Sequence, residues 1–197
     1  MPELANDLAL SKKIQSVKAS GIRIFDNKVS TIPGIIKLTL GEPDMNTPEH
    51  VKTAAIESIR NNDSHYAPQK GKLELRQAIS NYLKKASGVV YDPETEIVVT
   101  VGATEAINAT LFSITNRGDK VAIPTPVFSL YWPVATLADA DYVLMNTSED
   151  NFKLTPERLE STLKEESNIK AVILNYPVNP TGVEYTESEI RALAEVI

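Results

Sequence analysis

Residues 102–104, with the sequence Gly-Ala-Thr, have the composition of an anion-binding turn. They follow a β-branched run at residues 97–101 and open a segment with the apolar spacing of a helix. The N–H groups and the dipole at the start of a helix attract negative charge, and Thr104 can add a hydroxyl group. The turn therefore indicates a phosphate site, with an ordinary strand-to-helix connection as the alternative.

A group of aromatic residues follows Pro124 and Pro126. Prolines directly after a strand would hold Phe128 at the carboxyl edge of a sheet, where ligands of α/β proteins bind. A flat side chain there can stack on a heteroaromatic ring. The alternative is that Phe128, Tyr131 and Trp132 form the core face of a helix, and the aromatic residues alone favour that alternative.

Residues 175–182, Asn-Tyr-Pro-Val-Asn-Pro-Thr-Gly, carry the most specific pattern in the chain. Prolines and asparagines at this density fix the backbone and point amide side chains away from the end of the preceding strand. An amide such as that of Asn179 can donate to a phenolate oxygen and to a carboxylate. A plain turn at the end of a strand is the alternative.

The elements that would position these residues alternate between strand and helix. Apolar runs predict strands at residues 35–40, 97–101, 120–123, 142–145 and 169–174. Helical spacing and caps predict helices at residues 47–59, 75–86, 102–114 and 128–137, and from Thr155 and Thr186 onward. This alternation predicts an α/β fold with a mostly parallel sheet and helices on both faces. Residues 1–45 are expected to form an extended arm.

The composition excludes several classes of function. The chain of 197 residues has no cysteine and only two histidines, so disulfides and thiolate or histidine-rich metal sites are excluded, and we expect no metal. A net charge of −6 argues against a nucleic-acid surface. No apolar run reaches the roughly 20 residues that a membrane span needs. No secretion signal is present at the start, so a cytoplasmic location is expected.

Four motifs, which occur along the chain in the same order as in a known family, make the chain similar to that family. The string at residues 175–182, the turn at 102–104, Leu40-Gly41-Glu42-Pro43-Asp44 and the block from Tyr66 to Arg76 resemble the class I/II aminotransferases of fold type I. Within that family the chain looks most like the aromatic-amino-acid aminotransferases of lactic acid bacteria. The resemblance implies the N-terminal half of the large domain of that fold, with an arm and part of the small domain at residues 1–45 and the large domain at 46–197.

The resemblance also implies a cofactor, pyridoxal phosphate, and a role for each matching residue. Ala103 and Thr104 would hold its phosphate, Phe128 would stack on its ring, and Asn179 would donate to its ring oxygen. Gly41, Ile22 and again Asn179 would contact the substrate, an amino acid or a 2-oxo acid. Tyr66 would reach the phosphate in the other subunit of a homodimer. The remaining matching or notable residues, Asp44, Arg76, His50, His65 and Trp132, are expected to have structural or surface roles.

The catalytic lysine of the family is expected beyond Ile197, so we expect no catalytic residue in this chain. The chain stops two to three turns into an amphipathic helix that begins at Thr186, which indicates a truncated protein. The full-length protein is expected to transaminate an aromatic amino acid, and the fragment to be inactive. A β-lyase on the same fold and a non-catalytic module that senses pyridoxal phosphate are the alternatives.

Overall fold

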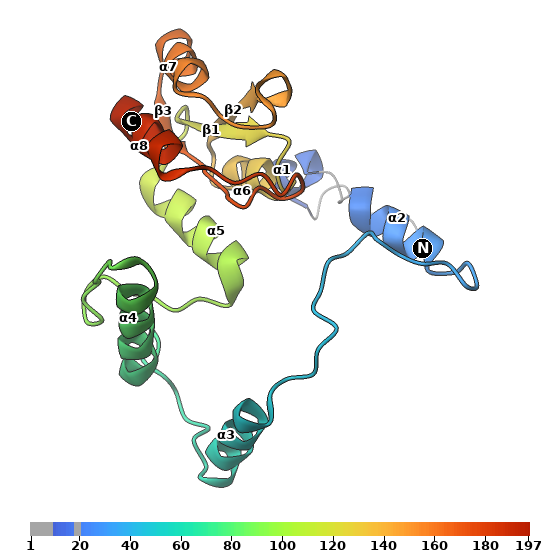
Figure 1. The fold of residues 1–197 in the computed structure, drawn as a ribbon, viewed down its shortest axis with the longest axis vertical. Coiled ribbons are helices and arrows are strands. Elements are labelled where there is room, and N and C mark those ends of the chain that lie inside the picture. Colours follow the sequence, from blue (N-terminus) through green and yellow to red (C-terminus); the bar gives the residue numbers. More distant parts are fainter. Residues whose placement is uncertain (1–9, 18–20) are drawn as a thin grey trace. The chain divides into compact units, whose positions relative to one another are not determined.

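The computed structural model describes residues 10–17 and 21–197, and the chain divides into two compact units (Figure 1). Of the described residues, the first unit contains 10–17 and Ala103–Ile197, and the second contains Gly21–Gly102. In the described part of the chain, no helix is long and apolar enough to cross a membrane.

The first unit is built on a parallel three-stranded sheet in the order β2-β1-β3. The strands are β1 (Lys120–Thr125), β2 (Asp141–Asn146) and β3 (Ile169–Val172). Val121, Ala122 and Ile123 of the central strand have no exposed surface. A strand that is apolar on both faces fits a parallel sheet covered by helices, and the three predicted strands of this region are confirmed.

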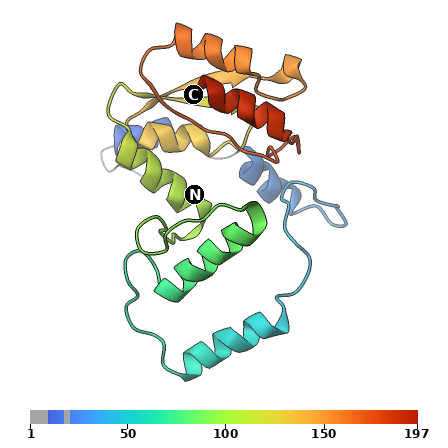
Figure 2. The same ribbon diagram turned by 60° about the vertical axis from the view of Figure 1, so that its left-hand side comes forward.

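Helices cover both faces of this sheet (Figures 1 and 2). On one face lie α5 (Gly102–Ile114) and α6 (Tyr131–Leu137), whose Leu111, Tyr131 and Val134 pack against Val121 and Ile123. On the other face lie α7 (Pro156–Glu165) and α8 (Glu187–Val196), which contribute Leu159 and Leu193. The α/β fold with helices on both faces is therefore confirmed.

The starts of α7 and α8 follow the predicted capping chemistry. The Thr155 side chain accepts from the N–H of Arg158, and Pro156 occupies the first turn. Thr186 and Glu189 form a reciprocal capping box.

Two short helices complete the described part of this unit. The 3-10 helix η1 (Ser148–Asp150) precedes α7. Helix α1 (Lys12–Ser16) lies in the N-terminal part of the unit, where Lys13 pairs with Asp139 at 2.7 Å.

The second unit contains α2 (Gly21–Val29), α3 (Glu49–Arg60) and α4 (Leu73–Ser87). Helix α4 ends at Gly88 in the left-handed conformation, with φ of 75°. Buried Arg76 and Ser80 of α4 donate to the carbonyl oxygens of Pro93 and Tyr91, which ties the helix to the chain that follows it. Arg76 thus has the structural role that was expected.

Two predicted strands are absent from the structure. Residues 35–40 and 97–101 have no ladder pairing; Ile36, Leu38 and Val101 are 86%, 92% and 91% exposed. A strand needs a neighbour for its backbone groups, and apolar, β-branched composition alone does not provide one. The N–H of Val99 instead donates to the carbonyl oxygen of Lys70 at 2.9 Å.

Three further predictions were wrong in detail. The arm at residues 1–45 is not simply extended, because it contains α1 and α2. Pro48, and not Thr47, occupies the N-cap position of α3. Helix α6 begins at Tyr131 and not at residue 128, which keeps Pro133 in the first turn, where its missing N–H costs no helical hydrogen bond. The expected division at residues 45 and 46 stays a prediction.

Candidate active site

Helix α5 runs in the direction opposite to that of β1 in the first unit. The helix ends at Ile114, and after a short turn β1 starts at Lys120 at the amino edge. Since Leu111 of α5 packs against β1, the helix runs back along the strand, and its first residues point toward the carboxyl edge. Ala103 and Thr104 stand at that end, and both are exposed.

The backbone at this helix start leaves space for a ligand. Gly102 has φ of +81°, and a Cβ atom added to it would meet nothing within 4 Å. The first N–H groups of a helix have no acceptor within the helix. The Thr104 carbonyl oxygen is already engaged, because it accepts from the Asn108 side chain at 2.9 Å. An exposed group of N–H donors with an adjacent hydroxyl group fits a phosphate.

Phe128 follows the end of β1 and is 40% exposed. It meets Tyr131 edge to face, with ring centroids 6.1 Å apart, while Tyr131 itself is buried in the core. Trp132 is half-buried and packs against the same core. The alternative that all three aromatic residues belong to a helical core face therefore holds for Tyr131 and Trp132, and Phe128 keeps an accessible ring.

The loop after β3 places Asn179 at the same edge. The N–H of Ile173 donates to Ala122, so β3 and its continuation run beside β1 toward the carboxyl edge. The N–H of Val178 then donates to Val183 at 2.9 Å, which closes the loop. Asn179 is exposed, and its N–H donates to the Asn175 side chain at 3.1 Å.

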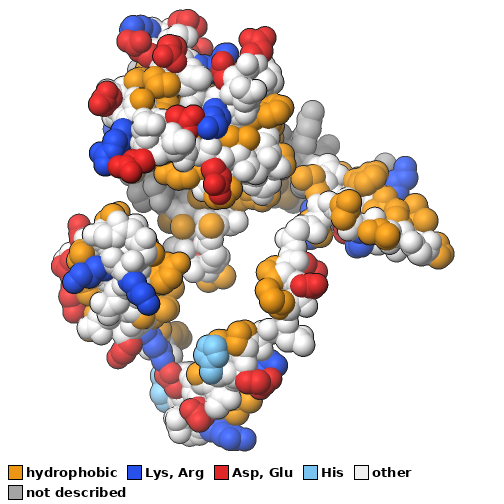
Figure 3. Space-filling view, in the orientation of Figure 1, with side chains coloured by type: hydrophobic (Ala, Val, Ile, Leu, Met, Phe, Trp, Pro, Cys, Tyr) orange, Lys and Arg blue, Asp and Glu red, His pale blue; other side chains and the backbone are white. Residues whose placement is uncertain are grey.

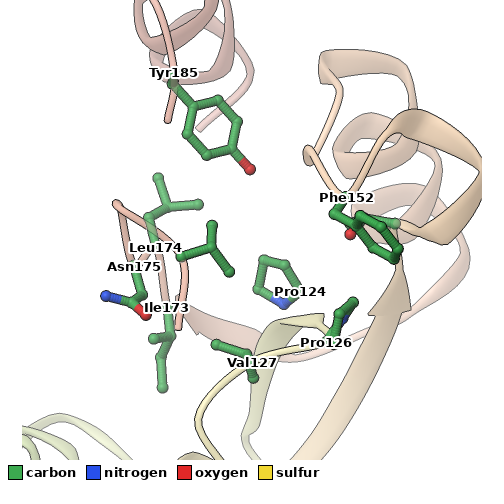
Figure 4. A pocket seen from close by; sticks show the side chains of 10 residues that line it. Pro124, Pro126, Val127, Phe152, Ile173, Leu174, Asn175 and Tyr185 are labelled. Carbon is green, nitrogen blue, oxygen red and sulfur yellow. The ribbon is translucent and has the colours of Figure 1, made fainter. Parts of the chain in front are cut away.

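Asn175 is the residue whose role the sequence reasoning missed. Its side chain shapes the turn that carries Asn179, and it also lines a small pocket between the strand ends (Figure 4). The signal was present, because Asn175 opens the motif and asparagine often bonds to backbone groups a few residues away. The other residues that line the pocket are Pro124, Pro126, Val127, Thr147, Phe152, Ile173, Leu174, Val178 and Tyr185.

One lysine, Lys153, follows a strand at this edge of the sheet, but it already has a partner. Its Nζ lies 2.8 and 2.9 Å from the two carboxylate oxygens of Glu189 and 5.8 Å from the centre of the Tyr185 ring. Hydrogen bonds from Lys153, and then from Thr186, lower the pKa of Glu189 to about 2. Lys153 thus anchors α8, and nothing in its surroundings makes it a substitute for a catalytic lysine.

The remaining residues from the sequence analysis lie in the second unit, where they are exposed. Ile22 is in the first turn of α2 and is 49% exposed. Gly41 lies in an irregular segment, and a Cβ atom added to it would meet nothing within 4 Å. The Tyr66 side chain is fully accessible. The structure thus places Ala103, Thr104, Phe128 and Asn179 in one unit and Ile22, Gly41 and Tyr66 in the other.

This fold and these motifs define a family. Residues 33–197 match the family described as aminotransferase class I and II, and the chain belongs to it. Members of this family depend on pyridoxal phosphate. The residues at the α5 N-terminus and the carboxyl edge fit that cofactor, since they offer N–H donors, an accessible ring and an amide.

Similar proteins and structures agree with this family. The chain is 42% identical, over 95% of its length, to a Bacillus subtilis protein named probable N-acetyl-LL-diaminopimelate aminotransferase. It is 38% identical, again over 95% of its length, to aromatic-amino-acid aminotransferase 2 of Thermococcus litoralis. The structure of Thermus thermophilus aspartate aminotransferase with maleate matches 95% of the chain with a TM-score of 0.88 and 33% identity.

The chain spans about half the length of the relatives that it matches. It covers 47% of the Bacillus protein, 48% of the Thermococcus protein and 50% of the Thermus structure. The fold described here is therefore that of an N-terminal half of these proteins. The narrower likeness to enzymes of lactic acid bacteria stays a prediction.

Proposed function

We propose that the whole protein is a pyridoxal-phosphate-dependent aminotransferase that moves the amino group of an aromatic amino acid to a 2-oxo acid. The observation that carries this proposal is the exposed turn with Asn179, which follows β3 at the same edge of the sheet as the accessible ring of Phe128. The open backbone at the start of α5 adds separate support. A homodimer and a cytoplasmic location belong to the same proposal.

Ala103 and Thr104 would bind the cofactor phosphate. Their N–H groups stand at the positive end of α5, which attracts an anion, and the Thr104 hydroxyl group adds a donor. The open space beside Gly102 lets a phosphate approach the backbone closely. These residues anchor one end of the cofactor and take no part in moving protons.

Phe128 and Asn179 would orient the cofactor ring. The exposed face of Phe128 offers a stacking surface, and packing against Tyr131 fixes its position. The Asn179 amide can donate to the ring oxygen and to a nearby carboxylate, and Asn175 holds the backbone of that turn. The bound cofactor supplies an electron sink for the loss of the α-proton of the amino acid.

The second unit would contact the substrate and the partner subunit. Gly41 offers an exposed N–H group without a side chain, which suits a carboxylate, and Ile22 offers an apolar surface that suits an aromatic side chain. Tyr66 does not pack within its own unit, so its hydroxyl group is available to the cofactor phosphate of the other subunit. The catalytic lysine is expected in the part of the family's length that this chain does not span.

The test is a substrate comparison on the full-length protein with its cofactor. Donors are phenylalanine, tyrosine, aspartate and N-acetyl-LL-diaminopimelate, each with 2-oxoglutarate as acceptor. We expect the highest kcat/KM with phenylalanine or tyrosine. A clear preference for aspartate or N-acetyl-LL-diaminopimelate would disprove the aromatic assignment only. Release of ammonia, a 2-oxo acid and the β-substituent without any acceptor, from an amino acid that carries a leaving group on Cβ, would instead identify a β-lyase. Cofactor binding without any turnover would identify a sensing module.

A further inference from the structure

Asp26 is an unusual buried residue of the second unit. In residues 21–41 it is buried together with Val29, while most other side chains of this stretch are exposed. Exposed apolar side chains gather on the surface over α2 and the loop that follows it (Figure 3). Aspartate is rarely buried to 8% exposure without a partner, so its surroundings require an explanation.

The partners of Asp26 come from the segment before Gly41. The Thr39 hydroxyl group donates to Oδ1 of Asp26, and Lys37 Nζ lies 3.4 Å from the same oxygen. Lys37 also donates to the Ser30 hydroxyl group at 3.0 Å, and that hydroxyl group donates to the Asp26 carbonyl oxygen at 2.7 Å. The Thr39 hydrogen bond and the nearby Lys37 lower the pKa of Asp26 although burial raises it, so the group stays ionised near neutral pH.

This network connects the two positions proposed to contact the substrate. Ile22 lies one helical turn before Asp26, on the same side of α2. Gly41 lies two residues after Thr39 in a segment without helical structure. The carboxylate is therefore the point at which the helix that carries Ile22 is joined to the segment that carries Gly41.

We propose that Asp26 is a positioning residue for the substrate carboxylate, an inference that rests on the proposed function. Thr39 and Lys37 hold the segment before Gly41 against α2, and the Gly41 N–H group is thereby kept in place for the carboxylate that amino acids and 2-oxo acids share. Without the network, the segment has to be ordered when substrate binds, which weakens binding. Ala103, Thr104, Phe128 and Asn179 belong to the other unit, so we expect substitutions at Asp26 and Thr39 to leave cofactor affinity unchanged.

The experiment uses the full-length enzyme with its cofactor and three substitutions. Asp26→Asn removes the charge, Thr39→Val removes the donor with little change of shape, and Thr39→Ser keeps the donor. Glu49→Gln is the control, because Glu49 makes an exposed ion pair with Lys52 on α3 at 2.6 Å. Steady-state kinetics with both substrates, cofactor affinity from absorbance, and hydrogen exchange at residues 37–41 are measured for each protein.

We expect Asp26→Asn and Thr39→Val to raise the KM of both substrates about tenfold, in line with the loss of one hydrogen bond to a charged group. We expect both variants to keep kcat and cofactor affinity and to show faster hydrogen exchange at residues 37–41. Thr39→Ser and Glu49→Gln should behave like the wild type. Wild-type KM values in both Asp26→Asn and Thr39→Val would overturn the inference. A joint loss of kcat and cofactor affinity would overturn it too, since that result indicates a general structural role.

The two proposals fail in different ways. If the wild-type enzyme turns over none of the donors, the proposed function fails. If the wild-type enzyme is active and the variants keep its KM, only the role of Asp26 fails. Unchanged hydrogen exchange at residues 37–41 in Asp26→Asn overturns that role whatever the activity, because the carboxylate would then not anchor the segment.

Discussion

Gly71 comes so close to Val99 that no other residue fits without a shift of the chain. A Cβ atom added to Gly71 would lie 2.7 Å from Cβ and from Cγ2 of Val99, and Gly71 has φ of +91°. The carbonyl oxygen of the preceding residue, Lys70, accepts a hydrogen bond from the Val99 N–H at 2.9 Å. Gly71 therefore lets the loop after Tyr66 pack against the segment at residues 97–101.

We expect Gly71→Ala to destabilise the protein by about 2–4 kcal/mol, which combines the cost of positive φ with that of the steric overlap. Gly118→Ala is a matched control, because Gly118 has φ of +94° and an added Cβ atom would meet nothing within 4 Å. The control should lose only about 1 kcal/mol. Urea unfolding of both variants measures the difference, and equal losses would show that the contact with Val99 is easily relieved.

Asn179 gives a second prediction for a single residue. Asn179→Ala should lower kcat/KM of the full-length enzyme about 10- to 100-fold, because one hydrogen bond to a charged group contributes roughly 1.5–3 kcal/mol. Asn146→Ala is the comparison, since Asn146 also ends a strand of the sheet and its side chain accepts only from the N–H of Ser148, at 3.0 Å. Catalytic efficiency that is equal in the two variants would remove Asn179 from the proposed site.

The loop after β2 and the start of α8 are joined by the carboxylate of Glu189. Glu189 accepts from Lys153, from the Thr186 N–H at 2.6 Å and from the Thr186 hydroxyl group at 2.9 Å. Its pKa is lowered from 4.5 to about 2, so the folded state stabilises the ionised form of the carboxyl group. The resulting stability is present above pH 4.5 and is lost as the pH falls through about 2.

We therefore expect Glu189→Gln to lower the melting temperature at pH 7, and the difference from the wild type to shrink as the pH falls from 4.5 toward 2. Glu187→Gln is the control, because Glu187 makes an exposed ion pair with Arg191 at 2.7 Å on the same helix. That control should change little at any pH. A pH-independent effect of Glu189→Gln would mean that the lost packing of the side chain, and not its charge, explains the change.

The sequence predicted those elements whose signals are local. Thr155, Thr186 and Gly88 marked helix ends correctly because caps act within one turn. The strands at 120–125, 141–146 and 169–172 were found because they pair with each other within this chain. Residues 97–101 have the same composition, but the described residues provide no strand beside them, and composition cannot supply a partner.

For the candidate site, the alternation of elements predicts Phe128 and the loop with Asn179 at the carboxyl edge, because each follows a strand. The turn at Gly102 opens α5 as predicted, but the strand expected before it is absent. Asn175 was missed although it opens the motif, and its role is its hydrogen bond with the backbone of Asn179. Asp26 could not be singled out from the sequence, because its role depends on a contact with Thr39 that is visible only in three dimensions.

The proposed role of the exposed Tyr66 would make the site depend on the assembly of two subunits. If Tyr66 acts in the partner's site, a mixture of the Tyr66→Ala and Asn179→Ala enzymes, unfolded and refolded together, should recover about a quarter of wild-type activity. Half of the dimers would be mixed, and one of the two sites in each would carry both native residues. Each variant refolded alone is the control. If the mixture recovers no more activity than the two variants refolded alone, Tyr66 acts in the site of its own subunit.

The separation of the proposed residues into two units has an evolutionary consequence. The residues proposed for the cofactor, Tyr66 excepted, lie in Ala103–Ile197, whereas Ile22 and Gly41 lie in Gly21–Gly102. If Ile22 contacts the substrate as proposed, mutations near it change which side chain is accepted while the cofactor stays anchored, so a new specificity need not pass through an inactive ancestor. Such independent variation would produce relatives with different substrates, and three relatives named for aspartate, for aromatic amino acids and for N-acetyl-LL-diaminopimelate are 36%, 38% and 42% identical to this chain.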